Sequence, residues 1–180
     1  MKRLILIRHG QTQKAKNDPE RTLTFEGEDG IAEAAEKLRP YLMGEVVILH
    51  SPTLRTRQSA IIIGEVLGCE DIRAAGLRMI GPEYITSRAN SSELLGIPAA
   101  AIYMQKMHDQ PDQIETPDQL VTRFNEIFNT IKEETVIAVG HEPAIMCFLN
   151  AVKDFSVLYK SFEQDLYYTD FIVLEKKQVI

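Results

Sequence analysis

Short apolar runs alternate along the chain with longer segments in which apolar residues recur every three or four positions. The runs at residues 3–7, 46–49 and 134–139 are apolar almost throughout, which is typical of strands buried on both faces of a parallel sheet. A weaker run at 71–77 also predicts a strand, and the tail at 168–174 is typical of an edge strand. These runs predict the strands of one sheet.

Helical spacing of apolar residues marks the segments between the runs. It covers residues 28–42, 55–67, 91–107 and 117–131, and a further helix, opened by a proline, covers 144–152. Strands that alternate with helices of this length favour an α/β protein. We therefore predict a three-layer α/β fold, in which a mostly parallel sheet carries helices on both faces.

Nothing in the sequence divides the chain into parts. Its 180 residues contain no internal repeat, low-complexity run or linker, and this length is usual for one domain. We expect a single domain over residues 1–180, in which the partly irregular stretch 76–116 forms a lid over the site.

Basic side chains follow three of the predicted strands, at the point where each strand ends. Arg8 and His9 follow the first strand, Arg55 lies at the start of the helix after the second, and His141 follows the strand at 134–139. The carboxyl ends of parallel strands meet in one crevice, where open α/β sheets bind their ligands. Two guanidiniums, two imidazoles and at least one helix N-terminus in this crevice suit phosphate oxygens, so the sequence predicts a phosphate pocket.

His9 is the candidate nucleophile of this pocket. An imidazole attacks phosphorus only when it is neutral, and we expect the like charges of Arg8 and Arg55 to disfavour the imidazolium. The same arginines would stabilise charge on the transferring phosphoryl group, with a further hydrogen bond from His141. This chemistry needs no metal and no cofactor, and the two arginines would repel a metal cation.

Three motifs in this sequence resemble the signatures of the histidine phosphatase superfamily, which includes the cofactor-dependent phosphoglycerate mutases. They are Arg-His-Gly-Gln-Thr at 8–12, Ser-Pro-Thr-Leu-Arg at 51–55 and Val-Gly-His at 139–141. The resemblance implies a phosphoglycerate mutase-like fold and phosphorylation of His9 during turnover. It also implies that substrate is bound by Arg8, Thr12, Arg55 and His141.

The general acid is the point at which this chain departs from the family pattern. In mutase-like members a glutamate follows the third strand in a Leu-Arg-Glu context, where this chain has Leu-Arg-Met at 77–79. Glu83 lies a few residues further on, and Glu142 directly follows His141; we favour Glu83 as the acid, with Glu142 as the alternative. A phosphoramidate leaves more readily than an alkoxide and needs such an acid less. The His-Glu-Pro run at 141–143 resembles a motif of the small bacterial phosphohistidine phosphatases.

The amino-acid composition of the chain disfavours some classes of binding partner. The 26 acidic and 20 basic residues give a net charge of −6, which opposes binding to nucleic acid or to an anionic membrane. No apolar run approaches the roughly 20 residues of a membrane-spanning helix. Cys69 and Cys147 are too few and too scattered for a disulfide framework or a zinc site, so we expect reduced thiols and a cytoplasmic protein.

Three functions are compatible with these features. We favour a metal-independent phosphatase that hydrolyses a phosphate ester or a phosphoramidate through a phosphohistidine on His9. A phosphoglycerate mutase-type transfer is the second, although many such members have Trp and Asn where this chain has Lys14 and Ala15. The third is a non-catalytic module that binds phosphate or a phosphopeptide. The expected partner is a small phosphorylated metabolite or a phosphoprotein, and the sequence does not indicate an oligomeric state.

Overall fold

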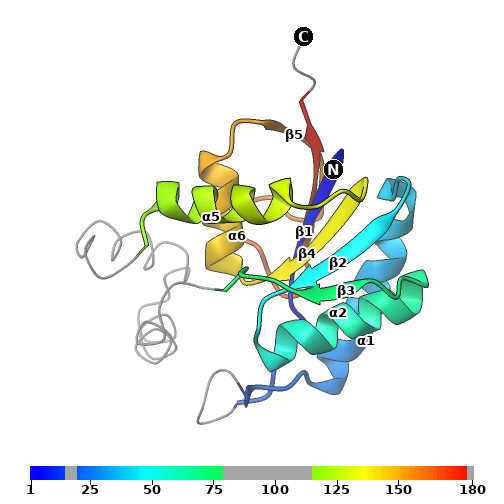
Figure 1. The fold of residues 1–180 in the computed structure, drawn as a ribbon. Coiled ribbons are helices and arrows are strands. Elements are labelled where there is room, and N and C mark those ends of the chain that lie inside the picture. The colour runs from blue at the N-terminus through cyan, green and yellow to red at the C-terminus, as the bar shows by residue number, and fades with distance from the viewer. Residues whose placement is uncertain (15–19, 79–114, 178–180) are drawn as a thin grey trace.

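The computed structural model describes residues 1–14, 20–78 and 115–177. In this part of the chain six strands form one sheet, in the order β3-β2-β4-β1-β6-β5 (Figure 1). Neighbouring strands from β3 to β1 run parallel, whereas β6 is antiparallel to β1 and β5 is antiparallel to β6. The strands are β1 (Arg3–Arg8), β2 (Val46–His50), β3 (Ile72–Ala74), β4 (Thr135–Gly140), β5 (Phe155–Lys160) and β6 (Phe171–Lys176).

Helices cover both faces of the sheet, which confirms the three-layer α/β prediction (Figure 1). One face carries α1 (Phe25–Leu38) and α2 (Leu54–Leu67), and the other carries α5 (Pro117–Asn129) and α6 (Glu142–Ala151). A short 3-10 helix, η2 (Arg39–Tyr41), follows α1. No helix in the described ranges is both long enough and apolar enough to cross a membrane.

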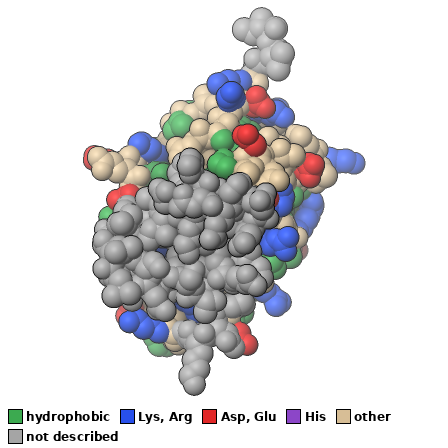
Figure 2. Space-filling model, turned by 90° about the vertical axis from the view of Figure 1, so that its left-hand side faces the viewer, with side chains coloured by type: hydrophobic (Ala, Val, Ile, Leu, Met, Phe, Trp, Pro, Cys, Tyr) green, Lys and Arg blue, Asp and Glu red, His purple; other side chains and the backbone are tan. Residues whose placement is uncertain are grey.

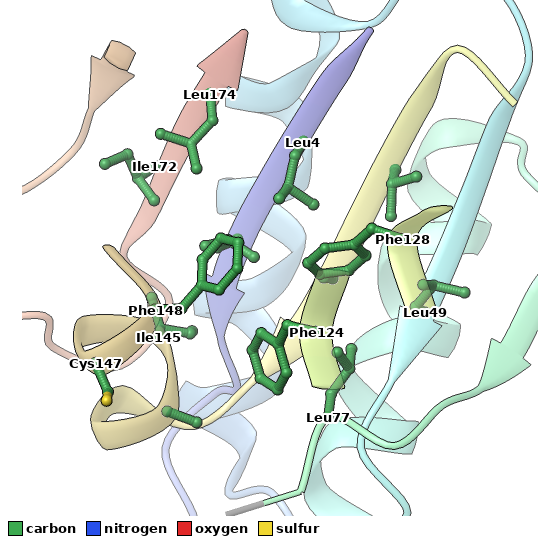
Figure 3. Close-up of a cluster of buried hydrophobic side chains, with 14 of the residues drawn as sticks. Leu4, Leu49, Leu77, Phe124, Phe128, Ile145, Cys147, Phe148, Ile172 and Leu174 are labelled. Atoms are coloured by element: carbon green, nitrogen blue, oxygen red, sulfur yellow. The ribbon is translucent and has the colours of Figure 1, made fainter. Parts of the chain in front are cut away.

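Alternation along β1 divides the core into two clusters. Leu4 and Leu6 pack on the side of α5 and α6, and Ile5 and Ile7 pack on the side of α1 and α2. The α5–α6 side is shown in Figure 3, where the rings of Phe124, Phe128 and Phe148 meet with centroids 5.4–5.8 Å apart. All of these side chains are fully or almost fully buried, so the sheet is held rigidly between the two helix layers.

The helix starts carry the caps that their sequences favour. Thr24 Oγ1 accepts a hydrogen bond from the Gly27 amide at the start of α1, over 3.0 Å. At the start of α5, Thr116 and Gln119 form a reciprocal capping box, in which each side chain accepts from the other residue's amide. These caps satisfy amides that the first helical turn leaves unpaired.

The tail of the chain differs from the prediction. The segment expected as an edge strand forms β6, which lies between β1 and β5, and β5 is the edge. The prediction was wrong because Phe171 to Leu174 is a continuous apolar run, the pattern of an interior strand, and all four residues are buried. β5 was missed because most of its residues are exposed and a β-bulge between Val157 and Tyr159 interrupts its alternation.

Other helices and strands begin or end a few residues away from the predicted positions. The weak strand at 71–77 shortens to Ile72–Ala74, and the helix expected at 117–131 ends at Asn129. The helix expected at 91–107 and most of the expected lid at 76–116 lie outside the described residues. The lid therefore stays a prediction.

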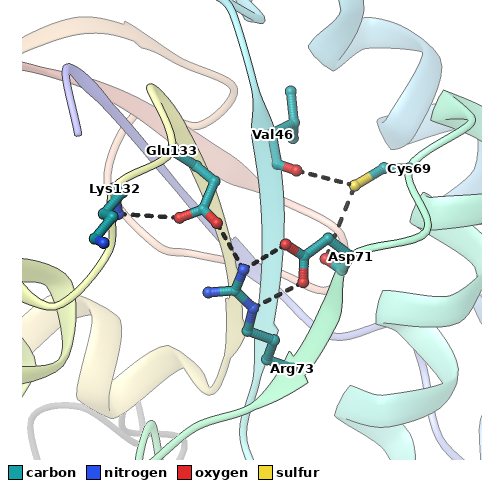
Figure 4. Close-up of polar contacts among 6 residues, drawn as sticks. All are labelled: Val46, Cys69, Asp71, Arg73, Lys132 and Glu133. Carbon is teal, nitrogen blue, oxygen red and sulfur yellow. Dashed lines mark hydrogen bonds and ion pairs between the residues drawn. The ribbon is translucent and has the colours of Figure 1, made fainter.

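The guanidinium of Arg73, in β3, links the residues that precede β3 and β4 (Figure 4). It donates to both carboxylate oxygens of Asp71 and, over 2.6 Å, to Glu133 Oε1. The hydrogen bond to Asp71 is the main reason why the pKa of Arg73 is raised. A pocket of about 460 Å³ lies beside this group and is lined by the carboxylates of Glu45, Glu70, Asp71 and Glu133. The acidic residues of this pocket disfavour phosphate at this end of the sheet.

Candidate active site

The carboxyl ends of β1, β2 and β4 meet at the end of the sheet opposite to Glu133. His9 follows β1 and donates its amide to Gly140 O over 3.1 Å, and Ser51 follows β2 and donates its amide to Val139 O over 3.2 Å. His141 follows β4 and forms the N-cap of α6. Parallel pairing of the three strands thus places all three residues in one cluster, together with Arg55 from the first turn of α2.

Hydrogen bonds define which nitrogen of His9 is free to react. Nδ1 lies 2.8 Å from the carbonyl oxygen of Gly10, which can only accept, so Nδ1 carries the proton. Arg55 Nε donates to the other nitrogen, Nε2, over 3.2 Å. His9 is therefore held as the tautomer whose Nε2 lone pair points to a guanidinium.

Gly10 is required for this geometry. Its amide donates to Ser59 Oγ over 3.2 Å, and Ser59 Oγ donates in turn to the carbonyl of Arg55 over 2.8 Å. A β-carbon at position 10 would lie 2.4 Å from the carbonyl oxygen of Gly27, closer than two such atoms can approach. Only glycine therefore allows β1 and α1 to approach so closely behind the His9 ring.

The pKa of His9 is lowered well below its usual value. Burial is the largest cause, since only 6% of the residue is exposed, and the neighbouring His141 and Arg55 follow. The hydrogen bond to Gly10 acts in the opposite direction. Arg8, which the sequence suggested as a main cause, is the smallest contributor. The ring is consequently neutral at neutral pH, and burial explains more of this than the arginines do.

Arg55 and His141 form the centre of the cluster. Arg55 Nη2 lies 3.5 Å from His141 Nδ1, and His141 Nε2 lies 3.0 Å from Ser51 Oγ. The rings of His9 and His141 meet edge to face, with centroids 5.3 Å apart. Arg55, Ser51 and His141 are almost wholly buried, so the charge of Arg55 acts with little screening by water.

Arg8 lies at the rim of the cluster, with 16% of its side chain exposed. Its Nη1 donates to the carbonyl oxygen of Leu166 over 2.6 Å and pairs with Glu142 Oε2 at 3.0 Å. The ring of Tyr168 lies against the guanidinium, with 4.3 Å between Arg8 Cζ and the ring centroid. Glu142, one of the two carboxylates considered as the acid, is thus part of the cluster.

Thr12 and Glu83 are the other two residues that the sequence predicted for the site. Among the described residues, Thr12 Oγ1 accepts a hydrogen bond from Arg21, and its backbone pairs with Leu23. Its role in substrate binding stays a prediction. Glu83 lies outside the described residues, and its role as the acid stays a prediction as well.

Sequence reasoning placed Ser51 at the end of the second strand and Ser59 just after the second motif but gave neither a role, and it missed Leu166 and Tyr168 as members of the cluster. A strand end and a spacing of one helical turn after Arg55 are the signals that indicate contacts of Ser51 and Ser59 with the site. Leu166 and Tyr168 carry no such signal, because they lie in a loop near the end of the chain. Only the pairing of β6 with β1 brings them to Arg8.

Basic and acidic side chains are mixed on one face of the molecule. On the face shown in Figure 2, Lys and Arg side chains are mixed with Asp and Glu around the described part of the surface. The residues of ranges 1–14, 20–78 and 115–177 include no group of three or more His, Cys, Asp or Glu placed to hold a metal ion. The cluster of Arg8, His9, Arg55 and His141 suits an anion, because its two guanidiniums are charged hydrogen-bond donors.

The fold and this cluster define an α/β protein with a histidine-centred anion site at its strand ends. The family model of the histidine phosphatase superfamily (branch 1) matches residues 4–175, so the chain belongs to that superfamily. This membership supports phosphatase activity, and with it a hydrolase. No curated protein matches the chain in sequence.

Solved structures share the fold at low sequence identity. One is assigned as the phosphohistidine phosphatase SixA of Agrobacterium tumefaciens, with 19% identity and a TM-score of 0.53 over 83% of this chain and 75% of that one. Another is a mycobacterial glucosyl-3-phosphoglycerate phosphatase, with 20% identity and a TM-score of 0.58 over 83% of this chain and 78% of that one. At these identities the likeness shows the fold alone.

Proposed function

We propose that this protein is a phosphatase that hydrolyses a phosphate ester or a phosphoramidate through a phosphohistidine on His9. The observation that carries the proposal is the pair of contacts on the His9 ring. Gly10 O fixes the proton on Nδ1, and the unprotonated Nε2 accepts a hydrogen bond from the guanidinium of Arg55. A neutral nucleophile whose lone pair lies beside a phosphate-binding group is the arrangement that attack on phosphorus requires.

In the first step Nε2 attacks phosphorus, a P–N bond forms, and the bond to the leaving group breaks with its electron pair on the leaving group. Before this attack, Arg55 Nε moves from Nε2 to an oxygen of the incoming phosphoryl group, which frees the lone pair, and Arg8 and His141 donate to the same group. Since these donors are preorganised and largely buried, they stabilise the charge of the transition state. In the second step water attacks phosphorus, the P–N bond breaks, phosphate leaves, and His9 returns as the neutral ring.

The leaving group needs a proton when it is an alkoxide. Glu83 and Glu142 are the two proposed donors, and Glu83 stays the first choice, as the sequence indicated. Glu142 Oε2 is engaged with Arg8 at 3.0 Å, so Glu142 would have to release that guanidinium before it acted on a leaving oxygen. A phosphoramidate such as phosphohistidine depends less on this proton donor.

We propose a phosphorylated metabolite or a phosphoprotein as the substrate and turnover without a metal ion. The two named structural neighbours act, by their descriptions, on these two classes of substrate. Arg8 and Arg55 would repel a cation from the position of the phosphoryl group. The two thiols, Cys69 and Cys147, are free, as we expect for a protein that acts in the cytoplasm.

The test is the release of nitrophenol from para-nitrophenyl phosphate in EDTA by wild type and His9→Ala, with phosphohistidine as a second substrate. We expect metal-free turnover that His9→Ala abolishes. A brief reaction quenched in alkali should trap an alkali-stable, acid-labile phosphoryl group on wild type only. Binding of phosphate without turnover of either substrate would favour the non-catalytic module, and transfer to a second phosphorylated metabolite rather than to water would favour the mutase.

A further inference from the structure

Arg8 is held by a segment of chain far from it in sequence. Leu166 O accepts from its Nη1, the Tyr168 ring lies against its guanidinium, and Asp170 O accepts from its backbone amide over 3.0 Å. All three groups belong to residues 161–170, the loop between β5 and β6, which we call the Arg8 cradle. Glu142 is the one further residue that pairs with Arg8 in the described part of the chain.

Hydrogen bonds to the carboxylate of Asp170 hold the two ends of the Arg8 cradle together. Oδ1 accepts from Ser161 Oγ and Oδ2 accepts from the Tyr167 amide, each over 2.8 Å. Ser161 Oγ also accepts from the Phe171 amide, which ties the loop to the start of β6. Thr169 completes the turn with a φ of 65°, a conformation that a threonine rarely adopts and that the surrounding hydrogen bonds hold in place.

Tyr168 lies on the boundary between the Arg8 cradle and the nucleophile. Its ring centroid is 5.6 Å from that of His9 and 4.3 Å from Arg8 Cζ, and 36% of the residue remains exposed. Its neighbour Tyr167 is 67% exposed and makes neither contact. Of these two adjacent tyrosines, only Tyr168 contacts His9 and Arg8 among the described residues.

We propose that Tyr168 is a positioning residue, whose ring holds the guanidinium of Arg8 at the phosphate site. The inference rests on the proposed function, in which Arg8 binds the phosphoryl group. An incoming phosphate competes with the carboxylate of Glu142 for Arg8, because both are anions that seek the same donors. The aromatic ring is uncharged and does not compete, so it keeps the guanidinium in place while the anionic partner is exchanged.

The test compares Tyr168→Leu, Tyr168→Phe and the matched control Tyr167→Leu in the full chain. Inorganic phosphate is titrated calorimetrically, and kcat and KM are measured with para-nitrophenyl phosphate. We expect Tyr168→Leu to raise the Kd of phosphate and the KM by about tenfold, which is the size of a partly desolvated cation–π contact, while kcat changes by less than about threefold. Tyr168→Phe retains the ring and Tyr167→Leu lacks the contact, so both should stay within about twofold of wild type.

A double variant separates positioning from damage to the loop. In an Arg8→Gln background, Tyr168→Leu should change the Kd of phosphate by less than about twofold, because the residue through which it acts is gone. An undiminished effect in that background, or an equal loss in Tyr168→Phe, overturns the inference. So does wild-type phosphate affinity in Tyr168→Leu. If wild type itself neither binds phosphate nor releases nitrophenol, the proposed function is overturned and this inference with it.

Discussion

Arg55 Nε donates a hydrogen bond to Nε2 of His9 over 3.2 Å, so the guanidinium faces the very atom that would attack phosphorus. This contact exists only because the His9 ring is neutral: an imidazolium has a proton on both nitrogens and repels the arginine. The environment enforces that state mainly by burial and secondly by charge. The relation between these two residues therefore links the protonation of the site to its readiness to receive phosphate.

The first prediction concerns the titration of His9. Because its pKa is lowered, His9 should remain neutral below pH 6.5, where an exposed histidine already takes up a proton. Replacing Arg55 by Gln removes one positive charge and should raise the pKa of His9, yet leave it below 6.5, since burial is the larger cause. Nuclear magnetic resonance of the His9 ring in wild type and Arg55→Gln measures both values. A pKa at or above 6.5 in the variant would show that charge, and not burial, dominates.

Much of this site was predictable because it follows from strand order. Apolar runs identified β1, β2 and β4, and parallel strands bring their carboxyl ends together, so Arg8, His9 and His141 could be placed at one edge from the sequence alone. The N-terminal position of Arg55 on α2 followed from the same alternation of strands and helices.

Other parts of the site depend on contacts that no local pattern records. The Tyr168 ring reaches Arg8 through the antiparallel pairing of β6 with β1, and the exposed, bulged β5 concealed that pairing. The dominance of burial in the pKa of His9 depends on how completely the folded chain encloses the ring, which no local pattern records. The choice between the two candidate acids could not be made from the sequence, because Glu83 lies in a segment without a clear period, where hydrophobic patterns give little information.

The second prediction concerns the geometry of Arg55. Arg55→Lys keeps the positive charge but loses the planar fork that reaches His9 through Nε and His141 through Nη2. We expect kcat for para-nitrophenyl phosphate to fall by about a hundredfold, in the range seen when one preorganised donor is lost. Arg57→Lys is the matched control, since Arg57 is exposed on the same helix. A drop below about threefold in Arg55→Lys would mean that charge alone suffices.

The third prediction concerns the contact behind the nucleophile. Gly10→Ala would place a β-carbon 2.4 Å from Gly27 O, a backbone atom that cannot turn aside. We expect the free energy of unfolding to fall by about 1–3 kcal/mol, as for other overpacked core positions.

Gly140→Ala is the control for this variant. Gly140 directly precedes His141, but its β-carbon would meet only the Ile145 side chain, at an ordinary 3.7 Å. Urea unfolding of wild type and the two variants compares them directly. Equal stability of all three proteins would contradict the close approach of β1 to α1 at Gly10.

The fourth prediction separates the two candidate acids. Glu142 pairs with Arg8, and its carboxylate would repel a bound phosphate dianion. Glu142→Gln should therefore lower the inhibition constant of inorganic phosphate several-fold and leave kcat for para-nitrophenyl phosphate within about threefold of wild type. Glu83→Gln should leave the inhibition constant unchanged.

A comparison of substrates with different leaving groups then identifies which glutamate is the general acid. Nitrophenolate departs without a proton, whereas an alkoxide needs one, so loss of the true acid should spare para-nitrophenyl phosphate and slow an alkyl phosphate by about a hundredfold or more. Phosphohistidine should be affected less than the alkyl ester, because an imidazole leaves more readily than an alkoxide. We expect this selective loss in Glu83→Gln. If it occurs in Glu142→Gln instead, the Arg8–Glu142 ion pair is the resting state of the acid, and phosphate binding to Arg8 is the event that releases the carboxylate for proton transfer.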